Sequence, residues 1–163
     1  MADGATHPGE WRSEGMTKSY VAVYTATISA SPERIWAVVR DFATVASWNP
    51  IARESRLVGE RERELITSDG TLVRERMIKC DDDARHLTYQ MVTFPIPVTE
   101  QTNQILVVAG KSDDETNIRF EASFIPADGA DSNVIQGINL SAFASASEGL
   151  ARHLGVALVR ASL

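Results

Sequence analysis

The amino-acid sequence predicts an α+β protein, in which the buried face of a long antiparallel sheet packs against one long helix late in the chain. Residues 51–124 form a series of β-prone segments separated by turn signals. Residues 133–161 carry apolar side chains at steps of three and four, the spacing of one helix face. With 163 residues, 44% of them hydrophobic, the chain is long enough for one domain with a single core. We therefore expect a two-layer architecture, in which a helix layer covers one face of the sheet.

The chain divides into a short tail and one domain. Residues 1–18 are rich in glycine, serine, threonine and charge, so we expect a disordered or tag-like tail that is dispensable for folding. The domain is expected to span residues 19–163. The first residues lack the apolar segment of a secretory signal, and no run of about eighteen apolar residues predicts a membrane span.

The first part of the domain predicts one strand followed by two short helices. Residues 20–28 are β-branched and aromatic, which favours a strand. The Ser-Pro-Glu sequence at 31–33 suits a helix start, because serine caps, proline fits the first turn and glutamate complements the dipole. Asp41 caps a second short helix, which ends at residues 48–50 because the residue before proline avoids helical angles. The apolar face of the first helix is Ile35, Val38, Val39 and Phe42.

Six further strands are predicted, with acidic, glycine-containing or proline-containing turns between them. The last strand is the clearest, since its apolar residues at 118, 120, 122 and 124 alternate with polar ones and indicate one buried face. The predicted strands are 51–58, 61–67, 71–80, 85–93, 99–109 and 116–124.

The final segment, 133–161, is predicted to be a single long helix. Its centre, residues 141–149, is made of small residues with low helix propensity, so it needs a large surface to pack against. The same small side chains leave space opposite the sheet, where we expect an apolar cavity. The predicted stripe is Ile135, Ile138, Ala142, Ala146, Leu150, Leu154, Ala157 and Ala161.

Charge and composition exclude several function classes. The formal net charge of −6 repels nucleic acid and anionic membrane surfaces, and the cationic residues are scattered among acidic ones. A single cysteine, Cys80, permits no intramolecular disulfide and no thiolate cluster, which suits a cytoplasmic location. The histidines His7, His86 and His153 have no ligand spacing, and no glycine-rich phosphate loop is present. We therefore predict no metal, no cofactor and no nucleic-acid partner.

Several short sequences lie in an order that is typical of a known superfamily. They are Ile28–Glu33, Trp36, Asp41–Phe42, Trp48–Pro50, Asp69–Gly70, Glu75–Met77, Asp82–Asp83, Leu87, Tyr89, Phe94–Val98, Phe120–Pro126 and Gly149–Leu154. Together they resemble the START-like (SRPBCC) superfamily, especially its bacterial polyketide cyclase/dehydrase-type members. The resemblance implies a helix-grip fold, a curved seven-stranded antiparallel sheet wrapped around the long C-terminal helix with a cavity between them.

The resemblance implies a hydrophobic small-molecule ligand without fixing one activity. The first hypothesis is a binder of an aromatic, polyketide-like molecule that also cyclises or dehydrates it by acid–base chemistry. The alternatives are a non-catalytic carrier or sensor, and a protein-interaction module with a filled core. A cavity of several hundred Å³ favours a ligand, and two titratable groups converging on it favour an enzyme. The sequence leaves a homodimer open.

The candidates for acid–base chemistry are Glu75, Tyr89 and His153. A carboxylate in an apolar cavity has its pKa raised unless a cation pairs with it, a tyrosine donates to a carbonyl, and a histidine transfers protons near neutral pH. The structural alternatives are a Glu75 pair with Arg63 or Arg76 and a core role for Tyr89.

The candidate ligand-binding residues follow from strand alternation and from the long helix. Trp48 fits the mouth of the cavity or the core, and the proline-containing segment 94–98 is either a rim loop or a stiff connection. The full candidate set is Trp48, Met77, Leu87, Met91, Gln101, Asn103, Phe120, Phe143 and Leu150.

Overall fold

The computed structural model describes residues 17–162. Most of the predicted tail, residues 1–16, lies outside this range, so its dispensability stays a prediction. The elements in chain order are β1 (Tyr20–Ile28), α1 (Pro32–Val39), the 3₁₀ helix η1 (Phe42–Ser47), β2 (Ala52–Leu57), β3 (Glu62–Thr67), β4 (Leu72–Asp81), β5 (His86–Met91), β6 (Val98–Ala109), β7 (Thr116–Pro126), α2 (Ser132–Leu154) and β8 (Leu158–Ser162).

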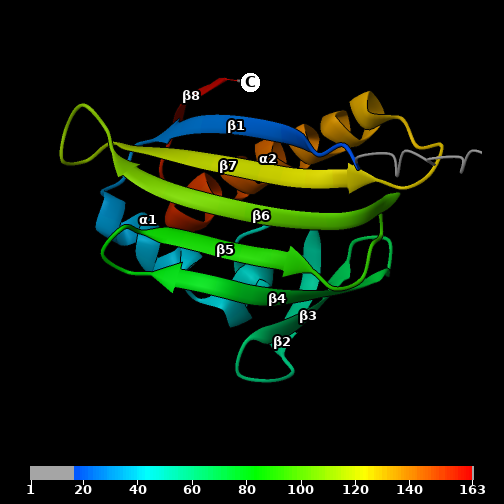
Figure 1. Ribbon diagram of the computed structural model, residues 1–163. Helices are drawn as coiled ribbons and strands as arrows, with labels where there is room; N and C mark the ends of the chain where they lie inside the picture. The colour runs from blue at the N-terminus through cyan, green and yellow to red at the C-terminus, as the bar shows by residue number, and fades with distance from the viewer. Residues whose placement is uncertain (1–16, 163) are drawn as a thin grey trace, which may run out of the picture.

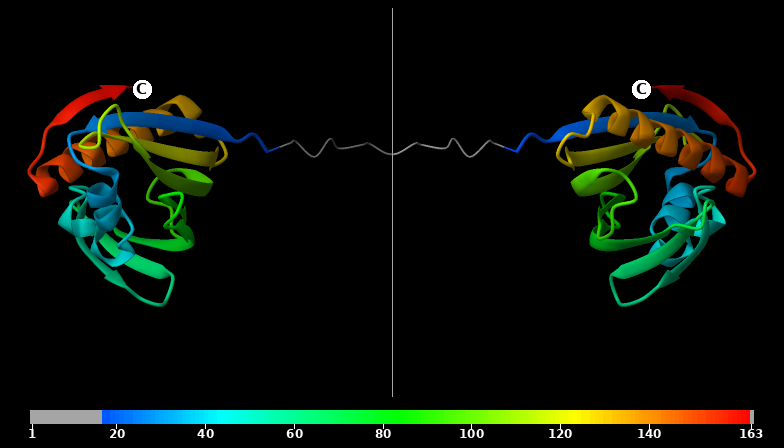
Figure 2. Two further views of the ribbon diagram at one scale, coloured as in Figure 1. Left: turned by 90° about the vertical axis from the view of Figure 1, so that its left-hand side faces the viewer. Right: turned by 90° about the vertical axis from the view of Figure 1, so that its right-hand side faces the viewer.

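One antiparallel sheet runs through the molecule in the order β2-β3-β4-β5-β6-β7-β1-β8. The sheet is strongly curved, and α2 lies along its inner side (Figure 1). The short helices α1 and η1 lie below α2 and close the rest of the open side (Figure 2). The predicted α+β helix-grip architecture is confirmed, with eight strands within residues 17–162 instead of the expected seven.

The two short helices begin where their capping residues predict. The Ser31 hydroxyl accepts a hydrogen bond from the Arg34 N–H at 3.3 Å, and Pro32 occupies the first turn of α1. The Asp41 carboxylate accepts from the Ala43 N–H at 3.2 Å, which starts η1. The second helix is of the 3₁₀ type and ends at Ser47, with Trp48 as its C-cap, just before the predicted stop at residues 48–50.

The predicted end of the long helix is wrong. Helix α2 ends at Leu154 because Gly155 takes the left-handed conformation, with φ at 66°, and donates its N–H to the carbonyls of Ala151 and Arg152. The chain then reverses, and residues 158–162 pair with β1 as the eighth strand. The alanines at 157 and 161 extended the apolar stripe by chance.

The buried face of α2 also differs from the predicted stripe. Ile138 is 40% exposed, whereas Asn139, one position further, is 4% exposed. A buried asparagine is invisible to a count of apolar residues, so the stripe was placed slightly off the true face. The buried residues of α2 are Ile135, Asn139, Phe143, Ala146, Ser147, Gly149, Leu150 and Ala151.

Candidate functional site

An internal cavity lies between the concave face of the sheet, α2 and the segment that follows η1. Its volume is about 140 Å³, smaller than the several hundred Å³ expected. A space of this volume holds on the order of ten water molecules. An apolar cavity of about 150 Å³ in another protein holds benzene, so a single aromatic ring fits this space. Nine of the twelve predicted site residues line it: Trp48, Glu75, Leu87, Tyr89, Met91, Gln101, Asn103, Phe120 and Phe143.

The other three predicted residues lie elsewhere. The side chain of His153 is at the surface, where its Nδ1 is 3.0 Å from the Ser47 carbonyl oxygen, so it joins α2 to η1 outside the cavity. Leu150 is fully buried in the core, and Met77 is partly buried against it. Neither side chain is among those that line the cavity.

Sequence reasoning did not assign Arg63 to the cavity, although it is the main partner of Glu75 there. Arg63 Nε and Nη2 lie 2.7 and 2.6 Å from Glu75 Oε2, and both side chains are less than a tenth exposed. The two residues face each other across β3 and β4. The structural alternative for Glu75, a pair with Arg63, is therefore what the structure contains, and the carboxylate is balanced by a cation.

The Arg63 guanidinium is held between two aromatic rings as well as by Glu75. Its central carbon lies 3.9 Å from the centre of the Phe42 ring and 5.0 Å from that of Tyr89, and Nη1 donates to the Phe42 carbonyl at 3.1 Å. Burial, and then the negative charge of Glu75, raise the pKa of the Tyr89 phenol well above its ordinary value. Tyr89 is therefore a neutral hydroxyl at physiological pH.

Three buried amides form a second polar group on the same wall. Gln101 Nε2 donates to Asn103 Oδ1 at 3.0 Å and to Asn139 Oδ1 at 2.8 Å. Asn103 stands directly opposite Tyr89 across β5 and β6, so the amides continue the polar band that begins at Glu75. Asn139 comes from α2 and was missed by the apolar stripe.

The segment after η1 is clamped against α2 and presents Trp48 to the cavity. A Cβ at Gly149 would lie 2.2 Å from the Trp48 carbonyl oxygen and 2.5 Å from Pro50 Cδ, so only glycine allows this approach. Trp48 is 6% exposed, and its Nε1 is the buried side-chain donor of residues 17–162 that has no hydrogen-bond partner. Of the two alternatives for Trp48, the structure combines a core position with a place in the cavity wall.

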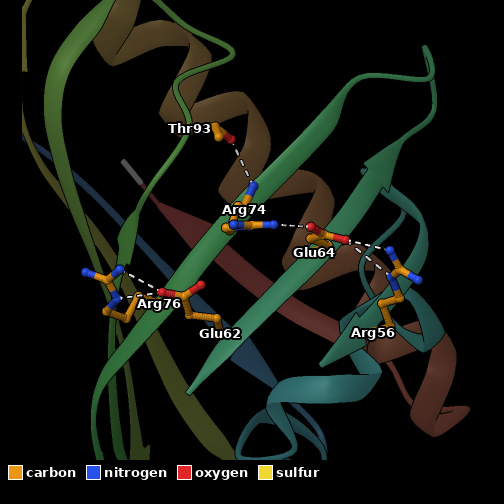
Figure 3. Close-up of polar contacts among 6 residues, drawn as sticks. All are labelled: Arg56, Glu62, Glu64, Arg74, Arg76 and Thr93. Carbon is orange, nitrogen blue, oxygen red and sulfur yellow. Dashed lines mark hydrogen bonds and ion pairs between the residues drawn. The ribbon is translucent and has the colours of Figure 1, made fainter. Parts of the chain in front are cut away.

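The outer face of the same strands carries a second set of ion pairs. Arg76 pairs with Glu62 at 2.7 Å, while Glu64 lies between Arg56 and Arg74 (Figure 3). Glu62–Arg76 and Arg63–Glu75 are consecutive cross-strand pairs of one hairpin, so they point to opposite faces. The hairpin therefore contains one solvent-exposed arginine–glutamate pair, Arg76–Glu62, and one buried pair beside the cavity, Arg63–Glu75.

A surface hollow of about 450 Å³ adjoins the cavity and shares Ile51, Thr67 and Pro95 with it. Ile51 directly precedes β2, Thr67 ends β3, and Pro95 lies in the loop between β5 and β6. They mark where a molecule would enter, and Pro95 places the predicted proline-containing loop at this entrance. A gating role for the loop stays a prediction.

The described residues contain no group of three or more histidine, cysteine or acidic side chains arranged to hold a metal ion. None of the helices in this part of the chain is long and apolar enough to cross a membrane.

Comparison with known proteins places these features in a wider group. A family model described as polyketide cyclase/dehydrase and lipid transport matches residues 20–155. The protein XoxI from Bacillus cereus is 26% identical, with a TM-score of 0.75 over 81% of this chain and 93% of that one. No curated protein matches the chain.

Two further solved structures share the fold at lower identity. A START superfamily protein from Mycobacterium smegmatis is 17% identical, with a TM-score of 0.69 over 82% of this chain and 98% of the other. A truncated norcoclaurine synthase from Thalictrum flavum is 18% identical, with a TM-score of 0.70 over 85% of this chain and 94% of that enzyme.

Proposed function

Because the chain belongs to the polyketide cyclase/dehydrase and lipid transport family, we propose that it binds a small apolar or aromatic molecule in the cavity between its sheet and α2. The observation that carries the proposal is the cavity itself, a partly enclosed and mostly apolar space crossed by one band of polar groups. Its volume of about 140 Å³ suits a molecule of one aromatic ring, and a larger ligand requires the entrance segments to move apart.

Binding without catalysis is the form of this function that the side chains support best. The acidic and the basic side chain of the cavity wall, Glu75 and Arg63, are paired with each other. Tyr89 keeps its proton because its pKa is raised, and His153 lies outside the cavity. The groups that sequence reasoning offered for proton transfer are therefore suited to orienting a ligand.

Cyclisation or dehydration of the bound molecule is the second candidate, and one observation favours it. Glu75 and Tyr89 lie on neighbouring strands and line the same cavity, so one ligand oxygen can reach both. Both Arg63 contacts fall on Glu75 Oε2, and Oε1 is in none of the hydrogen bonds between residues 17–162. In an enzyme, Glu75→Gln and Tyr89→Phe would each lower turnover about a hundredfold with affinity nearly unchanged, whereas in a carrier they would change affinity alone.

Native mass spectrometry of the protein purified from its own host tests the binding function. We expect a small molecule retained by the wild type and released on denaturation. Ala142 lines the cavity from α2, so Ala142→Phe should fill the space and remove the retained mass. Ser141→Phe, on the exposed neighbouring position, is the matched control and should retain it. Identical spectra for wild type and Ala142→Phe would contradict the proposal.

A further inference from the structure

A backbone carbonyl determines how the three buried amides of the cavity wall are turned. Asn139 Nδ2 donates to the Ile135 carbonyl oxygen at 3.2 Å, and because that oxygen can only accept, the amide nitrogen must face it. Asn139 Oδ1 is thereby turned toward the sheet, where Gln101 Nε2 donates to it at 2.8 Å. A return bond of 3.4 Å from Asn139 Nδ2 to Gln101 Oε1 completes the pair.

The same polarity passes on to Asn103. Gln101 Nε2 has two hydrogens; the first goes to Asn139, and the second goes to Asn103 Oδ1 at 3.0 Å. Turning the Asn103 amide over would set two NH₂ groups against each other. Its Nδ2 therefore points away from Gln101, and none of the hydrogen bonds between residues 17–162 uses it. Asn103 is 4% exposed and lines the cavity, so these two N–H groups are directed to the cavity.

We infer that Asn103 is the specificity-determining residue of the cavity and selects a ligand that presents a hydrogen-bond acceptor oxygen, such as a carbonyl, on a neutral apolar ring. The inference rests on the proposed binding function and adds the chemical class of the ligand. The Asn103 NH₂ group is accessible from the cavity, so an apolar ligand that covers it without offering an acceptor costs it a hydrogen bond, whereas a ligand oxygen supplies one. Trp48, whose buried Nε1 has no hydrogen-bond partner within residues 17–162, also lines the cavity.

The charges of the cavity wall favour a neutral ligand over an amine. Glu75 is the acidic side chain that lines the cavity, and Arg63 lies 2.6 Å from it. A cation attracted to Glu75 would also be repelled by Arg63 at close range, so the pair offers it little net attraction. A carbonyl ligand avoids this conflict and satisfies Asn103.

Three probes with the same carbon skeleton test the inference in the wild-type protein. They differ at the carbon attached to the ring, which carries a carbonyl oxygen in acetophenone, only hydrogens in ethylbenzene and an ammonium group in 1-phenylethylamine. Dissociation constants come from amide and side-chain NH₂ shifts in nitrogen-15 NMR titrations. We expect acetophenone to bind about tenfold more tightly than ethylbenzene, the factor for about 1.4 kcal/mol, with the amine weakest. The Asn103 NH₂ proton signals should move downfield with acetophenone, the direction that a new hydrogen bond causes, and should show no such hydrogen-bond shift with ethylbenzene.

The variant Asn103→Leu removes the donor, and Thr102→Val, on the opposite face of β6, is the matched control. Asn103→Leu should abolish the preference for acetophenone, whereas Thr102→Val should keep it. Equal binding of acetophenone and ethylbenzene by the wild type overturns the inference while the binding function stands. Preferred binding of the amine also overturns it and points to Glu75. Failure of all three probes to bind also overturns the inference, whereas the binding function is decided separately by native mass spectrometry of the wild type and Ala142→Phe. The wild-type titrations decide these outcomes even if Asn103→Leu does not fold.

Discussion

Replacing Arg63 by methionine tests whether the charged wall of the cavity is shielded from water. The substitution keeps an unbranched side chain and removes the cation, which leaves a buried Glu75 carboxylate and a Phe42 carbonyl without their donor. Breaking a buried pair by removing one partner costs about 3–5 kcal/mol, because the remaining charge is uncompensated. Urea unfolding at neutral pH should show a loss of this size with an unchanged m-value.

The outer face of the same hairpin supplies the control. Arg76→Met breaks the Arg76–Glu62 pair, whose side chains are 51% and 27% exposed, and should cost no more than about 1 kcal/mol. The double variant Arg63→Met with Glu75→Leu should recover most of the lost stability, since two packed apolar side chains replace the pair. Equal losses for Arg63→Met and Arg76→Met would refute the reasoning and indicate a hydrated pair.

Two further predictions concern the clamp on α2 and the turn at the entrance. Gly149→Ala should lower the free energy of unfolding by about 1–3 kcal/mol, although alanine favours a helix, because the new Cβ meets the Trp48 carbonyl. The control is Gly137→Ala, whose Cβ meets nothing within 4 Å and which should raise the free energy of unfolding by about 0.4–1 kcal/mol. Hydrogen bonds from Thr67, then Thr71, lower the pKa of Asp69 from 3.8 to about 2, so its charge stabilises the fold above pH 4 and this contribution is lost as pH falls toward 2. The midpoint of thermal unfolding of Asp69→Asn should therefore lie below that of the wild type at pH 5–7 and approach it near pH 2; a difference independent of pH would contradict this.

Turn chemistry made most of the fold predictable from sequence. Acidic and glycine-containing turns separate the six central strands, and the structure has all six within a few residues of the predicted bounds. The helix end was missed because the alanines at 157 and 161 continue the apolar period. The helix ends before Gly155, because this glycine adopts a positive φ.

The candidate site was predictable as far as strand alternation reaches. Side chains two apart on β5 and β6 do share the cavity face, which is why most of the candidate residues line it. Arg63 and Asn139 are polar residues on buried faces, so a search for apolar periodicity does not identify them. His153 has the spacing of the helix face that carries Leu150, yet it lies in the last turn beside η1, where the Ser47 carbonyl is its partner.

A fluorine-19 NMR titration with fluorobenzene, a one-ring probe that donates no hydrogen bond, tests most directly whether the cavity binds a ligand. We expect saturable binding to the wild type and to Ser141→Phe, and its loss in Ala142→Phe, because the phenylalanine occupies the cavity. Thermal unfolding midpoints of the three proteins, measured beforehand, establish that each is folded. Binding that survives in Ala142→Phe, or no saturable binding to the folded wild type, would contradict the claim that this cavity is the ligand site.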